Sequence, residues 1–185
     1  MQQNILNKEP LMGSPHWGES KYWSYKDLRV HFRVTGEESN PPIVLIHGFG
    51  ASSDHWRNNA EIFASEGFRV FGIDLIGFGK SEQNLQSKIK HLENQFWANQ
   101  LASFLDEIVD IQKNGKVILI GNSLGALTAI TTLSNRPELI KTIIAAPLPE
   151  PVFVNPIKFS FPNWLLKVKS FLIKIVFHLF PLKTL

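Results

Sequence analysis

The sequence predicts an α/β protein with a mostly parallel, doubly wound sheet that follows an antiparallel hairpin. Short apolar runs ending in glycine-rich or polar loops alternate with helix-like stretches, and two aromatic-rich segments precede the first run. The composition agrees, because 44% apolar and 19% charged residues are typical of a globular chain. At 185 residues, one domain with a sizeable core is expected.

The strands are expected in two groups. Residues 21–25 and 28–34 are rich in aromatic and β-branched side chains and are separated by Lys26-Asp27, which predicts a hairpin. Continuous apolar runs predict strands that are buried on both faces, as in a parallel sheet. Four such strands are expected, at residues 43–46, 68–73, 116–121 and 140–149.

Helices are expected between the buried strands, each with its own stop signal or apolar face. The alternation of strands and helices stops after Pro149, so the last strands of the fold are expected to be missing. The predicted helices are residues 55–67, with Ser53 or Asp54 as N-cap and Gly67 as the stop; a long stretch ended by Gly115, with Phe96, Leu101, Phe104, Leu105 and Ile108 on one face; and residues 124–135.

The chain reads as three parts: an extension at residues 1–19, a core at 20–150 and a tail at 151–185. The start lacks the basic and apolar stretches of a signal peptide, so a cytoplasmic protein is expected. There is no cysteine, which excludes disulfides and thiolate chemistry. The net charge of the chain is +3, and five lysines lie after residue 155. The first 155 residues therefore offer no basic surface for nucleic acid.

The pentapeptide from Gly121 to Gly125 places Ser123 between a predicted strand and a predicted helix. A serine on such a tight turn is held clear of the sheet, and the two flanking glycines relieve crowding. The alternative is a chance motif that merely caps an ordinary helix. Because the context fits on both sides, we interpret Ser123 as a nucleophile.

A second motif, His47-Gly48-Phe49-Gly50, ends the first buried strand. Backbone N–H groups from this loop and from the residue after a nucleophile can stabilise an oxyanion, which assigns Phe49 and Leu124. His47 is interpreted as a residue that organises the loop rather than as the catalytic base, although a direct role stays an alternative.

Three pieces in this order, HGFGASSDHW, DLIGFGKS and GNSLG, resemble the α/β-hydrolase superfamily over about residues 20–150. The GNS variant resembles esterases, carbon–carbon bond hydrolases and pheophytinase-like enzymes. The resemblance implies Ser123 as nucleophile and implies that Asp74 and Gly79 shape a loop. Serine at this position argues against haloalkane dehalogenase or epoxide hydrolase chemistry, where a carboxylate attacks. Ala126 departs from the pattern, since many relatives have glycine there.

The resemblance implies an acid and then a histidine after the serine. After Ser123 the chain has two carboxylates, Glu138 and Glu150, and one histidine, His178. Glu138 is interpreted as a solvated residue, Glu150 as a weak candidate for the acid, and His178 as a polar position on an apolar helix. We therefore expect an amino-terminal portion of a longer hydrolase.

The tail is apolar but is interrupted by lysines, which argues against a transmembrane span. It is expected to start a helical cap over the active site, with peripheral membrane contact through residues 164–182 as the alternative.

The GFGKS segment lacks the earlier glycine of a phosphate loop, because Asp74 stands there, and the histidines lack metal-ligand spacing. No cofactor and no metal are expected.

The sequence thus predicts a serine hydrolase that acts on an ester or related acyl bond. Phe49, Trp56 and the aromatic residues of the tail favour an apolar small-molecule substrate, although such residues often belong to the core. The rival hypothesis is a non-catalytic binding protein that keeps the fold without a complete triad.

Overall fold

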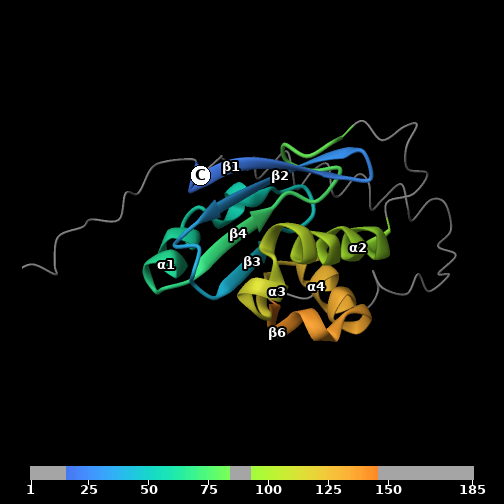
Figure 1. Ribbon diagram of the computed structural model, residues 1–185. Helices are drawn as coiled ribbons and strands as arrows, with labels where there is room; N and C mark the ends of the chain where they lie inside the picture. The colour runs from blue at the N-terminus through green and yellow to red at the C-terminus, as the bar shows by residue number, and fades with distance from the viewer. Residues whose placement is uncertain (1–15, 84–92, 146–185) are drawn as a thin grey trace, which may run out of the picture. The chain divides into compact units, whose positions relative to one another are not determined.

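The computed structural model describes residues 16–83 and 93–145, which form a six-stranded sheet with helices on both faces (Figure 1). The strand order is β1-β2-β4-β3-β5-β6. Strands β3 to β6 are parallel, whereas β1 and β2 are antiparallel, as predicted. The strands are β1 Glu19–Tyr25, β2 Leu28–Thr35, β3 Pro42–Ile46, β4 Arg69–Ile73, β5 Val117–Gly121 and β6 Ile140–Ala145.

The helices alternate with the parallel strands. A π-type turn, η2, and a left-handed Asp110 separate α2 from α3, so the predicted long helix is interrupted before Gly115. The helical elements are η1 Ser53–Trp56, α1 Ala60–Ser65, α2 Asn94–Phe104, η2 Leu105–Val109, α3 Ile111–Asn114, α4 Leu124–Asn135 and η3 Pro137–Leu139.

The hairpin prediction is confirmed. Strands β1 and β2 pair from Glu19–Val34 to Tyr25–Leu28, and only Lys26 and Asp27 connect them. Both turn residues have positive φ, 49° and 60°, as a two-residue turn that matches the strand twist requires.

Two apolar layers cover the two faces of the sheet. Along β3, Val44 and Ile46 belong to the larger cluster, with α2 and α4, while Ile43 and Leu45 belong to the smaller one, beside α1. Alternate side chains of a strand point to opposite faces, so one apolar run fills both layers. The doubly wound arrangement places the carboxyl ends of β3, β4 and β5 at one edge of the sheet.

Besides the interrupted long helix, three predictions about elements are wrong. The first helix is not continuous over residues 55–67, because η1 and α1 are separated by a turn at Asn58 and Asn59, residue types that favour turns. Its N-cap is Ser52, whose hydroxyl accepts from the Asp54 N–H at 3.3 Å. The fourth parallel strand is not buried: of β6, Ile140 alone is buried, and the Ile144 side chain is 50% exposed.

Candidate functional site

Ser123 lies at the turn between β5 and α4, at the carboxyl edge of the sheet. Its backbone has φ 50° and ψ −111°, a region that costs a non-glycine residue about 1–3 kcal/mol and that a normal helix cap does not occupy. Its side chain makes no capping hydrogen bond to α4. The turn therefore does not merely cap a helix: it holds a half-exposed serine in a strained conformation at the end of a buried strand.

Close packing of backbone on backbone fixes this turn. A Cβ on Gly125 would lie 2.2 Å from the Ile46 carbonyl oxygen, and a Cβ on Gly121 would lie 2.5 Å from the Gly125 carbonyl oxygen. The Asn122 N–H also donates to the Ile46 carbonyl at 3.0 Å. Only glycine permits these approaches, so both glycines of the motif have the spatial role that the sequence predicted.

The loop after β3 passes directly beside the serine. A Cβ on Gly48 would lie 2.7 Å from the Asn122 Oδ1 and 3.4 Å from the Ser123 Cβ. On the other side of the serine, the Leu124 N–H belongs to the first turn of α4, where helix geometry supplies no intrahelical acceptor. The structure thus brings the HGFG loop and the start of α4 together around Ser123.

His47 is buried, and both of its ring nitrogens are engaged. Nε2 accepts from the Leu75 N–H at 3.0 Å, so Nδ1 carries the proton and donates to the Gly48 carbonyl at 2.7 Å. Burial lowers the pKa of His47 and favours this neutral form. With both nitrogens bonded to backbone, His47 has no free basic nitrogen for Ser123, which agrees with its interpretation as a loop-organising residue.

Asp74 ties the loop after β4 to the rest of the site. Its carboxylate accepts from the Ser53 N–H at 2.6 Å and from the Lys80 N–H at 2.8 Å. Burial raises the pKa of Asp74, but hydrogen bonds from His31 and these backbone groups outweigh it and lower the pKa to about 2. Gly79 approaches so closely that its Cβ would lie 2.2 Å from the Asp74 Oδ2.

Exposed aromatic surface lies at the same edge. The Phe49 side chain is 79% exposed, and its ring meets that of the half-buried Phe78 edge to face at 5.3 Å. Phe78 in turn contacts the rings of His47 and Trp97. Phe78 was not predicted as a site residue, although its position in the glycine-rich loop after a parallel strand was the available signal. Trp56 instead packs against the core on the α1 face.

Several predicted residues are not assembled with Ser123. Glu138 is exposed and paired with Arg136, as its interpretation as a solvated residue requires. Glu150, His178 and the whole tail lie outside the described residues. Within residues 16–83 and 93–145, no histidine donates to or accepts from the Ser123 hydroxyl, and no group of three metal-binding side chains occurs.

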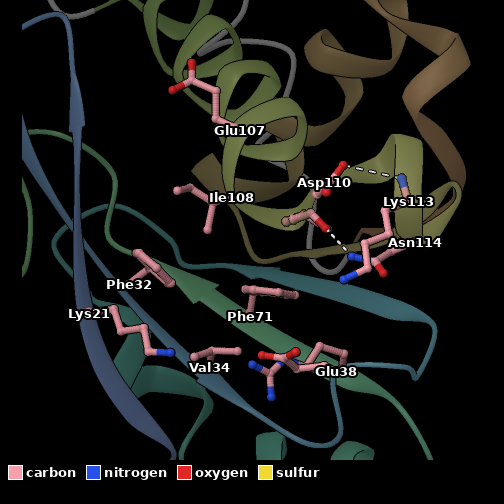
Figure 2. Close-up of a pocket in the computed structure, with 12 residues that line it drawn as sticks. Lys21, Phe32, Val34, Glu38, Phe71, Glu107, Ile108, Asp110, Lys113 and Asn114 are labelled. Carbon is pink, nitrogen blue, oxygen red and sulfur yellow. Dashed lines mark hydrogen bonds between the residues drawn. The ribbon is translucent and has the colours of Figure 1, made fainter.

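A separate cavity of about 360 Å³ opens at the opposite edge of the sheet (Figure 2). Arg69, at the start of β4, helps to line it, so it lies at the amino ends of the parallel strands rather than at the Ser123 edge. Its floor is apolar, including Phe32 and Phe71. The cavity is lined by equal numbers of positively and negatively charged side chains, and by no side chain with a hydroxyl or imidazole group. This cavity is therefore distinct from the Ser123 site.

None of the helices in the described part of the chain has the length and apolarity needed to cross a membrane. The tail, for which peripheral membrane contact was the alternative, lies outside the described residues.

The chain resembles known hydrolases of several kinds. Epoxide hydrolase 4 of Mus musculus is 30% identical over 147 residues, which are 78% of this chain and 39% of that protein. The 2-hydroxy-6-oxononadienedioate/2-hydroxy-6-oxononatrienedioate hydrolase of Burkholderia vietnamiensis is 33% identical over 121 residues, 64% of this chain and 39% of that protein. The chain thus spans about two fifths of the length of these curated relatives.

Among solved structures, the thioesterase domain from the curacin biosynthetic pathway superposes with a TM-score of 0.66 at 23% identity, and the match covers 84% of this chain and 52% of that one. At this sequence identity, the structural similarity shows only that the two proteins share a fold. The sequence profile of the alpha/beta hydrolase fold matches residues 41–176, which include both the HGFG loop and the serine turn. The chain therefore belongs to the alpha/beta hydrolase fold family.

Proposed function

We propose that this chain carries the nucleophile and the oxyanion hole of a serine hydrolase that cleaves an ester or related acyl bond. The observation that carries this proposal is the strained backbone of Ser123, with a φ of 50°. Its side chain makes no capping hydrogen bond, so a purely structural role would not explain this strain. Ser123 attacks the acyl carbon, and the N–H groups of Phe49 and Leu124 stabilise the oxyanion that forms. Water then resolves the acyl-enzyme.

The aromatic surface beside the serine supports an apolar acyl group as substrate. Phe49 exposes most of its ring next to Phe78, and large exposed aromatics commonly mark ligand sites. The relative from Burkholderia vietnamiensis is named as a hydrolase of 2-hydroxy-6-oxononadienedioate and 2-hydroxy-6-oxononatrienedioate, and not as an epoxide hydrolase. A serine hydroxyl at position 123 argues against the epoxide chemistry that other relatives are named for, because that chemistry uses an attacking carboxylate.

A base and an acid must complete the site. Both nitrogens of His47 are bonded to backbone, and His31 is bonded to Ser20 and Asp74, so we infer that the base comes from outside the described residues. Without a base, only the oxyanion hole and substrate binding remain, and these alone give feeble catalysis. We therefore expect hydrolysis to depend on a base that is supplied from outside the described residues.

The test compares hydrolysis of p-nitrophenyl esters of increasing acyl length by the protein and by its Ser123→Ala variant. Loss of the nucleophile is expected to lower kcat at least about a thousandfold. Ser134→Ala, an exposed serine on the same helix, is the matched control and should retain wild-type kcat. Equal hydrolysis by Ser123→Ala would exclude Ser123 as the nucleophile, and no hydrolysis by the wild type would favour the non-catalytic binding protein instead.

A further inference from the structure

A second serine, remote from the elbow, lies in a hydrogen-bonded chain with a histidine and an aspartate. Ser20, on edge strand β1, has its Oγ 2.8 Å from the His31 Nε2, and the His31 Nδ1 is 2.9 Å from the Asp74 Oδ2. The pairing of β1 with β2 creates this contact, because Tyr22 lies opposite His31 and Ser20 is its diagonal neighbour. Ser20 is exposed, whereas His31 and Asp74 are each only 1% exposed.

The proton positions in this chain follow from Asp74. Its pKa of about 2 keeps it a carboxylate, which can only accept hydrogen bonds. Nδ1 of a neutral His31 ring therefore carries the proton, and Nε2 presents its lone pair to the Ser20 hydroxyl. Serine is activated when its hydroxyl lies within hydrogen-bond distance of a base and a third group orients that base.

The surroundings hold the histidine ring and its neighbours in place. The His31 N–H donates to the Ser81 Oγ at 2.9 Å, and the His31 carbonyl accepts from the Asp74 N–H at 3.0 Å. The Tyr22 ring lies 5.2 Å from the imidazole on the outer side. A base that is immobilised in this way needs little reorganisation to take a proton from an exposed hydroxyl.

We propose that Ser20 is a second reactive serine, with His31 as its general base and Asp74 as the residue that positions the ring. Its substrates are activated acyl and phosphonyl donors, compounds with a good leaving group. With a fluorophosphonate, the Ser20 Oγ forms a bond to phosphorus, the phosphorus–fluorine bond breaks and fluoride leaves with the electron pair. The hydroxyl proton passes to the His31 Nε2 and then to water.

The experiment treats the 185-residue chain with a fluorophosphonate and maps the adduct by mass spectrometry of tryptic peptides. Ser24, exposed on the same face of β1, serves as the internal control, and cleavage after Lys21 places the two serines on different peptides. General-base assistance predicts an adduct on Ser20 about a hundredfold faster than on Ser24. Equal rates at the two serines would overturn the proposal.

Three variants separate the parts of the mechanism. The Ser123→Ala variant should keep the Ser20 adduct, so this result does not depend on the hydrolase proposal. His31→Gln should lower the Ser20 rate to that of Ser24 while the far-ultraviolet circular dichroism stays native. A Ser20 adduct that forms at the wild-type rate in folded His31→Gln would exclude His31 as the base.

A spectroscopic measurement on the wild-type protein keeps the proposal testable if His31→Gln does not fold. Long-range ¹H–¹⁵N spectra of the His31 ring should show a protonated Nδ1 and an unprotonated Nε2. Asp74→Asn should abolish this preference, because the amide no longer demands a proton from Nδ1. A wild-type ring protonated at Nε2 alone would contradict the proposed arrangement.

Discussion

Asp74 shows how one residue serves two parts of the molecule. One carboxylate oxygen accepts from the Ser53 N–H of η1, and the other accepts from His31 and from the Lys80 N–H. The buried charge is tolerated because three donors replace the water it lost. The role of Asp74 in shaping the loop was expected from the sequence, whereas His31 could not be expected as its partner, since strand pairing decides that contact.

This network predicts a pH dependence of stability. The pKa of Asp74 is lowered from 3.8 to about 2, so the stabilisation is fully present above pH 4 and is lost as the pH falls toward 2. The loss amounts to about 2 kcal/mol of unfolding free energy. Urea titrations at several pH values should show this decrease in the wild type and a smaller one in Asp74→Asn.

Glu138→Gln is the matched control for that experiment. The Glu138 side chain is exposed beside Arg136, and water screens such a pair, so its removal should leave the wild-type pH slope unchanged. An Asp74→Asn variant with the same acid slope as the wild type would contradict the assignment of the buried charge.

At the scale of elements, the contact between the end of β3 and the start of α4 creates the site. Gly125→Ala places a Cβ 2.2 Å from the Ile46 carbonyl and 2.7 Å from the His47 carbonyl, so the helix must move. Although alanine favours helices, we expect a loss of about 2 kcal/mol or more in unfolding free energy. Chemical denaturation measures it.

Gly67→Ala is the control for this substitution. Nothing lies within 4 Å of a Cβ on Gly67, so its cost is confined to a φ of 85°, about 1 kcal/mol. A Gly125→Ala variant that is as stable as the wild type would show that β3 and α4 are not in tight backbone contact.

The strands and the serine turn were predictable because they depend on local pattern: continuous apolar runs, two-residue turns and glycine spacing. The break after η1 was not predicted: Asn58 and Asn59 favour turns but also occur within helices, and local pattern alone does not separate the two cases. The exposure of β6 could not be predicted either, since its apolar run matches that of a buried strand. Burial depends on neighbours, which one segment does not encode.

At the scale of the molecule, β6 forms one edge of the sheet among the described residues, and its Ile144 side chain is half exposed. An exposed apolar edge strand promotes association between chains. We expect the 185-residue chain to aggregate with rising concentration and Ile144→Lys to reduce light scattering strongly. Lys141→Arg, which keeps the charge on the same strand, should scatter as the wild type does. A monomeric, cooperatively melting wild-type sample would contradict this expectation.

Trapping the covalent intermediate shows whether Ser123 is the attacking group. The protein is treated with a fluorophosphonate, and the modified residue is identified by peptide mass spectrometry in the wild type and in Ser20→Ala. We expect a stoichiometric adduct on Ser123 in both proteins. An active enzyme in which Ser123 stays unmodified while hydrolysis is blocked would contradict it.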